Sequence, residues 1–242
     1  MVFKIKVSGL VFEVHTLYKY SAAYCKDFFT NEPADIEIHI TMEDIEEERQ
    51  TCRRHDGSID ESLADSPAHY LESIVLLRKI ANEIVQHNRL LMHGSAVAVN
   101  NKGYIFTALS GTGKSTHTAL LRQLHGENAV MINDDKPFVH VEDGQAFVCG
   151  TPWMGKHRLG NNISVPLGGI FFLRRSEENV IREMSMEDAL MPLVSQCHRP
   201  VEADLLMQTF DLIEKLLGSV KLYDFGCNMD ISAAELSSSV MN

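Results

Sequence analysis

A glycine-rich stretch directly after an apolar segment constrains the fold of this chain more than any other feature. Residues 105–109 read Ile-Phe-Thr-Ala-Leu, and residues 110–116 read Ser-Gly-Thr-Gly-Lys-Ser-Thr. The apolar run predicts a buried strand, and the helix-forming residues 118–121 predict that a helix comes next. Glycines let the backbone curl so that successive N–H groups face inward, and a helix N-terminus favours an anion at the same point. The stretch therefore predicts a strand, a phosphate-binding loop and a helix.

Within this loop the residue types indicate binding of a nucleoside triphosphate. Lys114 is placed to reach the β- and γ-phosphates, and the Ser115 hydroxyl is placed to ligate Mg²⁺. Ala108 stands where the motif G-x-x-x-x-G-K-[ST] has its first glycine, which restricts the first turn of the loop. The alternative is a glycine-rich turn without a ligand. The predicted phosphate-binding residues are Ser110, Gly111, Thr112, Gly113, Lys114, Ser115 and Thr116.

Two adjacent carboxylates stand at the end of the next apolar strand. Residues 130–135 read Val-Met-Ile-Asn-Asp-Asp, and the gap after Lys114 has room for one short helix and a turn. A parallel β-α-β crossover places the carboxyl ends of both strands at one sheet edge, and this brings Asp134 and Asp135 near the phosphates. We expect Asp134 to hold Mg²⁺ and Asp135 to accept a proton from an attacking hydroxyl. The alternative is an Asp-Asp turn that caps the next element, helped by Pro137.

A polar, glycine-punctuated segment at residues 150–162 contains the single tryptophan of the chain. Its basic triplet, Lys156-His157-Arg158, supplies a local positive cluster around a phosphate that is being transferred. Arg158 is the cation expected to stabilise the transferred group. Trp153 would stack on a base or shape an acceptor pocket. The alternative is a solvated loop. The predicted acceptor-binding residues are Trp153, Lys156, His157, Arg158, Asn161 and Asn162. Arg199 is a weaker phosphate candidate, and we favour for it the capping of helix-end carbonyls.

Composition describes an ordinary globular chain with an acidic surface. The 242 residues are 45% hydrophobic and 23% charged, and 33 acidic residues against 22 basic ones give a formal charge of -11. This balance argues against a broad nucleic-acid or anionic-membrane surface. No apolar run is long enough to span a membrane and the start lacks a signal-peptide core, so we expect a cytoplasmic protein. Five scattered cysteines suggest neither a disulfide framework nor a zinc site.

The order of predicted elements suggests a small N-terminal part and a larger core. Residues 1–66 are expected to form a β/α subdomain with a charged segment at 43–66, which we predict to be a mobile loop or a partly helical lid. Residues 67–242 are expected to begin with a long helix and to form the phosphate-binding core with C-terminal helices; one continuous domain is the alternative. Core strands are predicted at 90–93, 96–99, 103–109, 129–132, 138–141, 146–149, 169–173 and 220–225, and later helices at 186–196, 202–217 and from 231.

These residues resemble a known family in their order and spacing. The run from Leu91 to Val99 with its His-Gly-Ser, the phosphate-binding loop and the Asn-Asp-Asp turn are similar to the kinase core of bacterial HPr kinase/phosphorylase. The loop is equally similar to that of ATP-dependent phosphoenolpyruvate carboxykinase, which shares that fold. The resemblance covers roughly residues 90–175 and implies an α/β fold with a mixed β-sheet and flanking helices. It also implies that His93 lies beside Asp134 or Asp135, although a histidine in this position is otherwise more typical of a core residue.

Departures from both relatives narrow the expected chemistry. HPr kinase has an acidic residue directly after the serine of the loop, where this chain has Thr116, and the carboxykinase needs ligands from a much longer chain. We therefore expect a Mg²⁺- and ATP-dependent kinase that phosphorylates a hydroxyl of a small molecule or of a peptide serine. The alternatives are a non-catalytic ATP-binding regulatory or accessory protein and an NTPase coupled to a partner. The expected catalytic residues are Asp135, Asp134, His93, Lys114 and Arg158.

Overall fold

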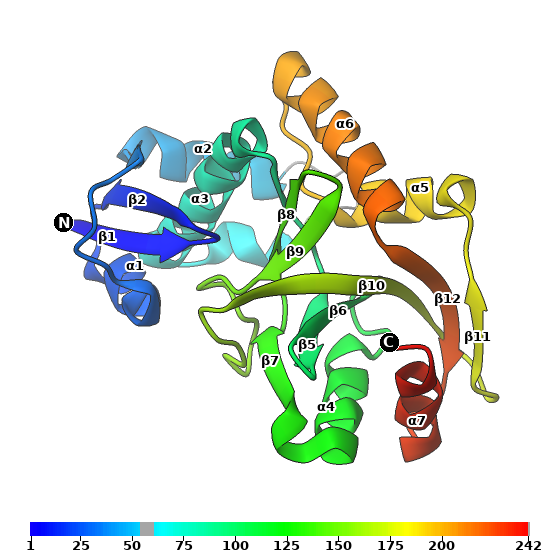
Figure 1. Ribbon diagram of the computed structural model, residues 1–242. Helices are drawn as coiled ribbons and strands as arrows, with labels where there is room; N and C mark the ends of the chain where they lie inside the picture. The colour runs from blue at the N-terminus through cyan, green and yellow to red at the C-terminus, as the bar shows by residue number, and fades with distance from the viewer. Residues whose placement is uncertain (54–60, 242) are drawn as a thin grey trace. The chain divides into compact units, whose positions relative to one another are not determined.

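The computed structural model describes residues 1–53 and 61–241, which form two compact units (Figure 1). The first unit ends at Glu83 and the second begins at Ile84. The sequence places a boundary at residue 66, before helix α3 (Ala68–Glu83), whereas α3 belongs to the first unit. The reason is packing, because α3 lies against α1 (Lys19–Tyr24) and α2 (Met42–Arg53).

A three-stranded sheet forms the first unit together with these helices. Strands β1 (Val2–Val7) and β2 (Leu10–His15) make an antiparallel hairpin, and β3 (Ile36–His39) pairs with β2 in parallel. The hairpin turn consists of Ser8 and Gly9, both with positive φ, as a tight two-residue turn requires. A 3₁₀ turn, Lys26–Phe28, comes after α1.

The charged segment predicted at 43–66 as a loop or lid is helical over most of its described part. Helix α2 covers its beginning, and a 3₁₀ helix covers Glu61–Asp65; residues 54–60 lie outside the described part. The few apolar residues of α2 explain this, since Ile45 and Cys52 lie on one helical face and are buried. Glu48, on the same face, forms an ion pair of 2.7 Å with Arg78 of α3.

The second unit is built on a mixed, nine-stranded sheet, which confirms the predicted α/β class. The strand order is β4-β8-β9-β10-β6-β5-β7, and β12 pairs with β10 and with β11. The long strand β10 pairs antiparallel with β9 near its start and lies parallel between β6 and β12 further on. The strands are β4 (Arg89–Leu91), β5 (Ser95–Val99), β6 (Lys102–Thr107), β7 (Ala129–Asn133), β8 (Phe138–Glu142), β9 (Gln145–Cys149), β10 (Ser164–Arg175), β11 (Val180–Glu183) and β12 (Lys221–Cys227).

Helices cover both faces of this sheet. Alternate residues of β5 enter two different cores, as the two-residue period of a strand requires. Ala96 and Ala98 pack in the core that includes α5 (Met186–Gln196) and α6 (Ala203–Ser219), and Val97 and Val99 pack in the core that includes α4 (Lys114–His125) and α7 (Ile231–Ser239). Short 3₁₀ helices occupy Ile84–His87 and Gly126–Asn128.

The two strands that lead into the predicted site are parallel but not adjacent. Strand β5 pairs antiparallel with β6 on one side and with β7 on the other, so β6 and β7 run in the same direction and end at the same edge. Helix α4 connects them (Figure 1). The predicted β-α-β arrangement is therefore confirmed, with one antiparallel strand between its two strands.

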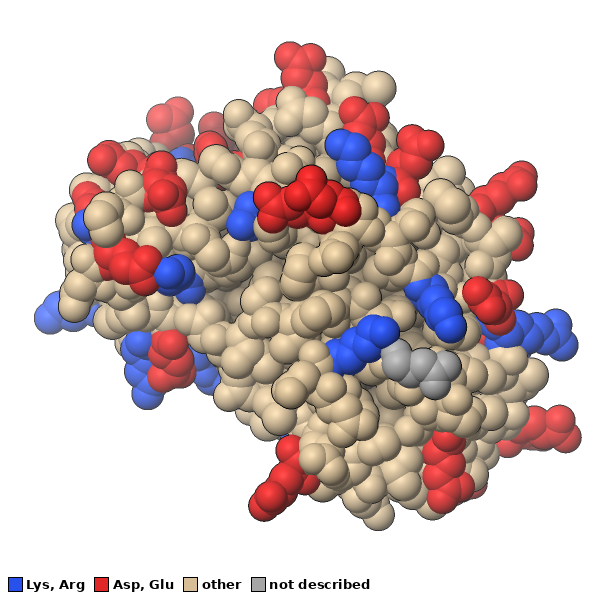
Figure 2. Space-filling model, in the orientation of Figure 1, with Lys and Arg blue, Asp and Glu red and all other residues tan. Residues whose placement is uncertain are grey.

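Charged side chains on the face in Figure 2 are dispersed, with acidic and basic groups interspersed and no extended basic patch among the described residues. All five cysteines are free thiols, and four of them are buried. Within the described part of the chain, no helix has the length and apolar character needed to span a bilayer.

Candidate functional site

The predicted phosphate-binding loop lies between β6 and α4. Gly111 and Gly113 have φ values of 77° and 125°, which only glycine adopts readily. A Cβ atom on either glycine would meet nothing within 4 Å, so the space in front of the loop is open. Lys114 begins α4, and its Nζ donates to the carbonyls of Ala108 at 2.9 Å and Leu109 at 3.3 Å. The lysine thus folds over its own loop, and burial lowers its pKa.

Asp134 is fixed by contacts to two other elements. It comes directly after β7 and is only 8% exposed. Its Oδ1 accepts a hydrogen bond of 2.6 Å from Ser95 Oγ, at the start of β5, and Ser95 Oγ lies 2.9 Å from Thr118 Oγ1 of α4. These contacts connect the acidic turn to the helix that carries the phosphate-binding loop. Ser95 belongs to the His-Gly-Ser run of the family resemblance, but neither its contact with Asp134 nor the part of Thr118 was expected from the sequence.

Asp135 forms a three-membered polar cluster with His93 and Lys136. Its Oδ1 lies 2.7 Å from Lys136 Nζ and 3.1 Å from His93 Nδ1, and the lysine and histidine nitrogens are 3.0 Å apart. The structure therefore brings His93 next to Asp135, as the family resemblance implies. Lys136 directly follows the acidic pair, and the sequence patterns did not identify it as a site residue.

The cluster changes the protonation of its members. Burial acts to raise the pKa of Asp135, but hydrogen bonds from His93 and Lys136 and the lysine charge outweigh it and lower the pKa to about 2. For His93, the hydrogen bond with Asp135 acts to raise the pKa, whereas burial and the charges of Lys136 and Lys114 together lower it. At neutral pH Asp135 is thus ionised, and the imidazole of His93 is predominantly neutral.

Asn133 holds the acidic turn in place. Its fully buried side chain accepts hydrogen bonds from the backbone N–H groups of Asp135 and Lys136 at 2.8 and 2.7 Å. Its Nδ2 donates to the carbonyl and the hydroxyl of Thr151, both at 3.0 Å. The Thr151 hydroxyl in turn donates to the carbonyl of Lys136 at 2.8 Å. This network fixes the direction of both carboxylates.

The loop of residues 150–162 approaches the acidic turn at one point. A Cβ atom on Gly155 would lie 3.3 Å from Asp135 Cβ, so the loop packs directly on the carboxylate. Lys156 and His157 line the cavity in front of this carboxylate. Arg158 is exposed and is not among the described lining residues.

Trp153 and the two asparagines of this loop lie elsewhere. Trp153 is only 6% exposed and belongs to the core, so its ring is not among the residues that line the cavity. Asn161 donates from Nδ2 to the Met131 carbonyl at 2.8 Å, which attaches the loop to β7. Asn162, like Asn161, is exposed and is not among the described lining residues. Arg199 donates to the Val194 carbonyl at 3.3 Å, near the end of α5.

These residues enclose a cavity of about 380 Å³. Its wall combines the loop and the start of α4 with both carboxylates. Lys114 and Lys156 add cationic side chains to it. The lining residues are His93, Ser110, Gly111, Gly113, Lys114, Ser115, Thr116, Asp134, Asp135, Gly155, Lys156 and His157. Backbone N–H groups and lysines suit phosphate, and the Ser115 hydroxyl with the Asp134 carboxylate is a donor set that suits Mg²⁺.

A second cavity, of about 490 Å³, adjoins the same loop. It shares Gly111, Gly113 and Thr116 with the first cavity. Arg175, at the end of β10, donates from Nη2 to the Gly111 carbonyl at 2.6 Å. The remaining lining residues are Thr112, His117, Ser176, Cys227, Asn228 and Met229. Burial lowers the pKa of His117 to about 4, so this imidazole is neutral at neutral pH.

Comparison with known proteins finds structural likeness that is distant. No family model matches the chain, and no curated protein matches it. Among solved structures, the chain is similar to the Hpr(Ser) kinase/phosphatase from Coxiella burnetii, with 14% sequence identity, over 52% of this chain and 90% of that chain, at a TM-score of 0.29. A likeness this distant does not assign a function, so the function is inferred from the geometry of the site.

Proposed function

We propose that this chain is a Mg²⁺- and ATP-dependent phosphotransferase that transfers the γ-phosphoryl group to a hydroxyl of a small molecule or of a peptide serine. The observation that carries the proposal is that Lys114 and the pair Asp134 and Asp135 line one cavity, although they come from different parts of the chain. A phosphate site with two carboxylates beside it provides for an anionic donor, a metal and an acceptor hydroxyl at the same place.

In this proposal the loop holds the phosphates. Gly111 and Gly113 leave open space where their side chains would otherwise stand, so phosphate oxygens can approach the backbone closely. The Nζ of Lys114 leaves the carbonyls of Ala108 and Leu109 and donates to phosphate oxygen instead. A donor to a charged oxygen makes a stronger hydrogen bond than a donor to a neutral carbonyl, so this exchange favours the bound state.

The two carboxylates have different tasks. Asp134 and the Ser115 hydroxyl are oxygen donors of the kind that Mg²⁺ prefers, and both line the cavity. When bound, Mg²⁺ neutralises charge on the phosphates. Asp135 orients the acceptor hydroxyl and takes up its proton. Because its pKa is about 2, its main contribution is orientation, which suits a phosphoryl transfer in which bond formation to the acceptor comes late.

The second cavity is suited to the nucleoside half of the donor. It adjoins the phosphate-binding loop and has a volume within the range of small-molecule sites. Met229 and Thr112 offer apolar atoms to a base, and Asn228 offers an amide. The acceptor then approaches from the opposite side, where Lys156 and His157 line the first cavity.

A second candidate is a regulatory protein that binds ATP without transferring phosphate. The ion pair between Lys136 and Asp135 favours it, because a carboxylate neutralised by an adjacent lysine is a weak base. ATP binding alone needs only the loop and one carboxylate that holds the metal. In a protein of this kind, the contacts of His93 and Asn133 would serve only to support the turn.

The test combines nucleotide binding with turnover. ATP binding is measured by calorimetry with Mg²⁺, and ADP release is measured against a library of hydroxyl metabolites and serine peptides. Lys114→Ala is expected to weaken ATP binding by roughly 10- to 100-fold, which corresponds to about 1.5–3 kcal/mol for a charge-assisted contact. The exposed Lys215→Ala is the matched control and should leave binding unchanged.

The carboxylate variants separate the two candidates. Asp135→Asn is expected to lower turnover by about 10²- to 10⁴-fold with little change in ATP affinity. Asp134→Asn is expected to raise the Mg²⁺ concentration needed for half-maximal activity. ATP binding without acceptor-dependent turnover would favour the regulatory protein, whereas a wild-type protein that does not bind ATP would refute both.

A further inference from the structure

The sheet of the first unit carries the same tripeptide pattern on two neighbouring strands. Residues 13–15 on β2 read Glu-Val-His, and residues 37–39 on β3 read Glu-Ile-His. The strands are parallel and in register, with Glu13 beside Glu37 and His15 beside His39. The central residues of both tripeptides are buried, so the two glutamates and two histidines share the opposite face.

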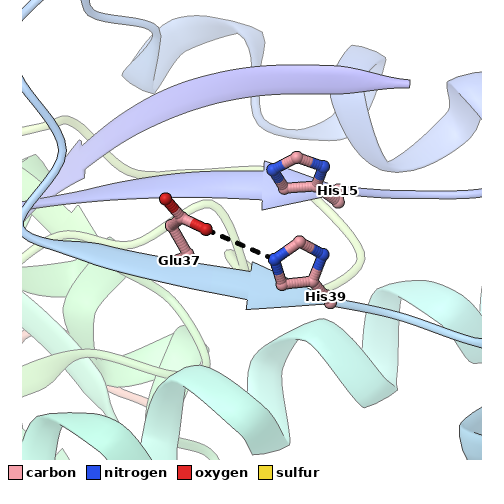
Figure 3. Close-up of side chains that lie close together, drawn as sticks. All are labelled: His15, Glu37 and His39. Carbon is pink, nitrogen blue, oxygen red and sulfur yellow. Dashed lines mark hydrogen bonds and ion pairs between the residues drawn. The ribbon is translucent and has the colours of Figure 1, made fainter.

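The four side chains lie close enough to act together. The rings of His15 and His39 are stacked, with centroids 4.1 Å apart. Glu37 Oε2 lies 3.4 Å from His39 Nε2, and Glu13 Oε1 lies 3.2 Å from His15 Nε2. One donor atom from each of His15, Glu37 and His39 lies within 4.8 Å of the others. Figure 3 shows both rings on the same side of the sheet, with the Glu37 carboxylate directed at His39.

Two carboxylates lie side by side on this face. Glu13 and Glu37 are in register on adjacent strands, and like charges in this position repel each other. Glu13 has one cationic neighbour from β1, Lys4, at 3.5 Å. The side chains of Glu37 and His39 are 65% and 60% exposed, so an ion from solvent can reach them.

We propose that His15, His39 and Glu37 bind a divalent transition-metal ion of the Zn²⁺ class, with Glu13 as the fourth ligand. Two imidazole nitrogens and carboxylate oxygens are a ligand set that suits zinc, which takes four ligands in tetrahedral geometry. A cation between the strands would relieve the repulsion of the glutamates and connect the edge strand β3 to β2. This site is independent of the phosphotransferase proposed above.

A pair of the same residue types elsewhere provides a matched control. On β8, His140 and Glu142 are also two positions apart, at 3.7 Å. The register neighbours of His140, however, are Arg89 on β4 and Phe147 on β9, which offer a positive charge and an apolar ring instead of a second histidine. This pair therefore lacks the features that favour a cation in the first unit.

The experiment titrates the chelator-treated full chain with Zn²⁺ at neutral pH by calorimetry, in the presence of excess Mg²⁺. Mg²⁺ prefers oxygen ligands and occupies competing carboxylate sites without displacing zinc from histidines. We expect one zinc equivalent that is lost in the His15→Ala/His39→Ala double variant and retained in His140→Ala. Each single histidine variant should weaken binding by roughly tenfold or more, since loss of even a second-shell partner costs about 10- to 100-fold.

Two readouts keep the result clear. Zn²⁺ should raise the melting temperature of the wild-type chain but not that of the double variant, because a ligand that binds only the folded state stabilises it. If circular dichroism shows that the double variant is unfolded, Glu37→Gln, which keeps the size of the side chain, replaces it and should weaken zinc binding. The proposal would be overturned if the folded double variant, or Glu37→Gln, took up as much zinc as the wild type. It would also be overturned if His140→Ala lost as much zinc binding as the double variant.

Discussion

Lys136 Nζ lies 2.7 Å from Asp135 Oδ1, so this carboxylate of the cavity wall is paired with the residue next to it in the chain. Together with the hydrogen bond from His93, the pairing keeps Asp135 ionised far below neutral pH, at a pKa of about 2. The basicity of the Asp135 carboxylate therefore depends on the neighbouring lysine as well. This contact and the cavities on both sides of the phosphate-binding loop determine how variants of the site should behave.

Lys136→Met should move the acid limb of the pH–rate profile to higher pH. In the wild type, Asp135 stays ionised down to a pKa of about 2. Without the lysine, the contacts with His93 still oppose the effect of burial, so the pKa of Asp135 rises from about 2 toward the ordinary value of about 3.9, and the ionised fraction decreases near pH 4. Turnover measured between pH 4 and 8 checks this, with Lys215→Met as the control. An unchanged profile in a folded Lys136→Met protein would show that Asp135 ionisation does not limit the rate.

Asn133→Ala should destabilise the fold and disorder the acidic turn. Asn133 is fully buried and makes four hydrogen bonds, and its removal leaves buried backbone N–H groups of the turn without an acceptor. We expect the free energy of unfolding to decrease by on the order of 3 kcal/mol, measured by urea denaturation. Thr151→Val leaves the side-chain oxygen of Asn133 in place as the acceptor for these N–H groups, so it should lower the free energy of unfolding by less. Equal stability of Asn133→Ala and wild type would contradict the role of this network.

Lys156→Ala should reduce turnover more than Arg158→Ala. Both side chains are exposed, but Lys156 lines the cavity beside Asp135 and Arg158 is not among the described lining residues. A cation that acts on the transferring group lowers kcat/KM when it is removed, and a solvated one does not. Steady-state kinetics with one acceptor decide between them. A larger loss in Arg158→Ala would restore the assignment made from sequence.

Met229→Trp should weaken nucleotide binding without affecting bare phosphate chains. Met229 lines the second cavity, and the larger ring would occupy space assigned to the nucleoside. Calorimetry with ATP and with inorganic tripolyphosphate separates the two halves of the ligand. We expect ATP affinity to decrease by roughly tenfold and tripolyphosphate affinity to stay constant, with the exposed Met207→Trp as the control. Equal affinity for ATP in both variants would place the nucleoside elsewhere.

Local sequence patterns predicted the fold of the second unit well. Its strands are short apolar runs separated by turn residues, so most of them, and helices α4 to α7, lie where they were expected. Strand β11 was missed, because its residues Val180–Glu183 show no apolar alternation and gain their structure from pairing with β12. Helix α2 was only partly anticipated. Most of its residues are charged, and its buried face consists of only three residues, Ile45, Glu48 and Cys52.

The candidate site shows which contacts a sequence can reveal. Lys114, Asp134 and His93 were expected together, because strand order and the family resemblance place them at one edge, and the structure does so. Lys136 and Asn133 were not recognised, since their roles depend on side-chain contacts across a turn. Trp153 was expected to stack on a base or to shape an acceptor pocket, but it is buried in the core.

Strand β5 acts as a spacer between the two halves of the site. Because it separates β6 from β7, the phosphate-binding loop and the acidic turn start two interstrand steps apart, or roughly 9.5 Å. That interval leaves room for a phosphate chain between Lys114 and Asp134. Since Ser95 on this spacer contacts Asp134, any shift of β5 in register would move the hydroxyl that holds the carboxylate, even though the spacing between the strands stays the same.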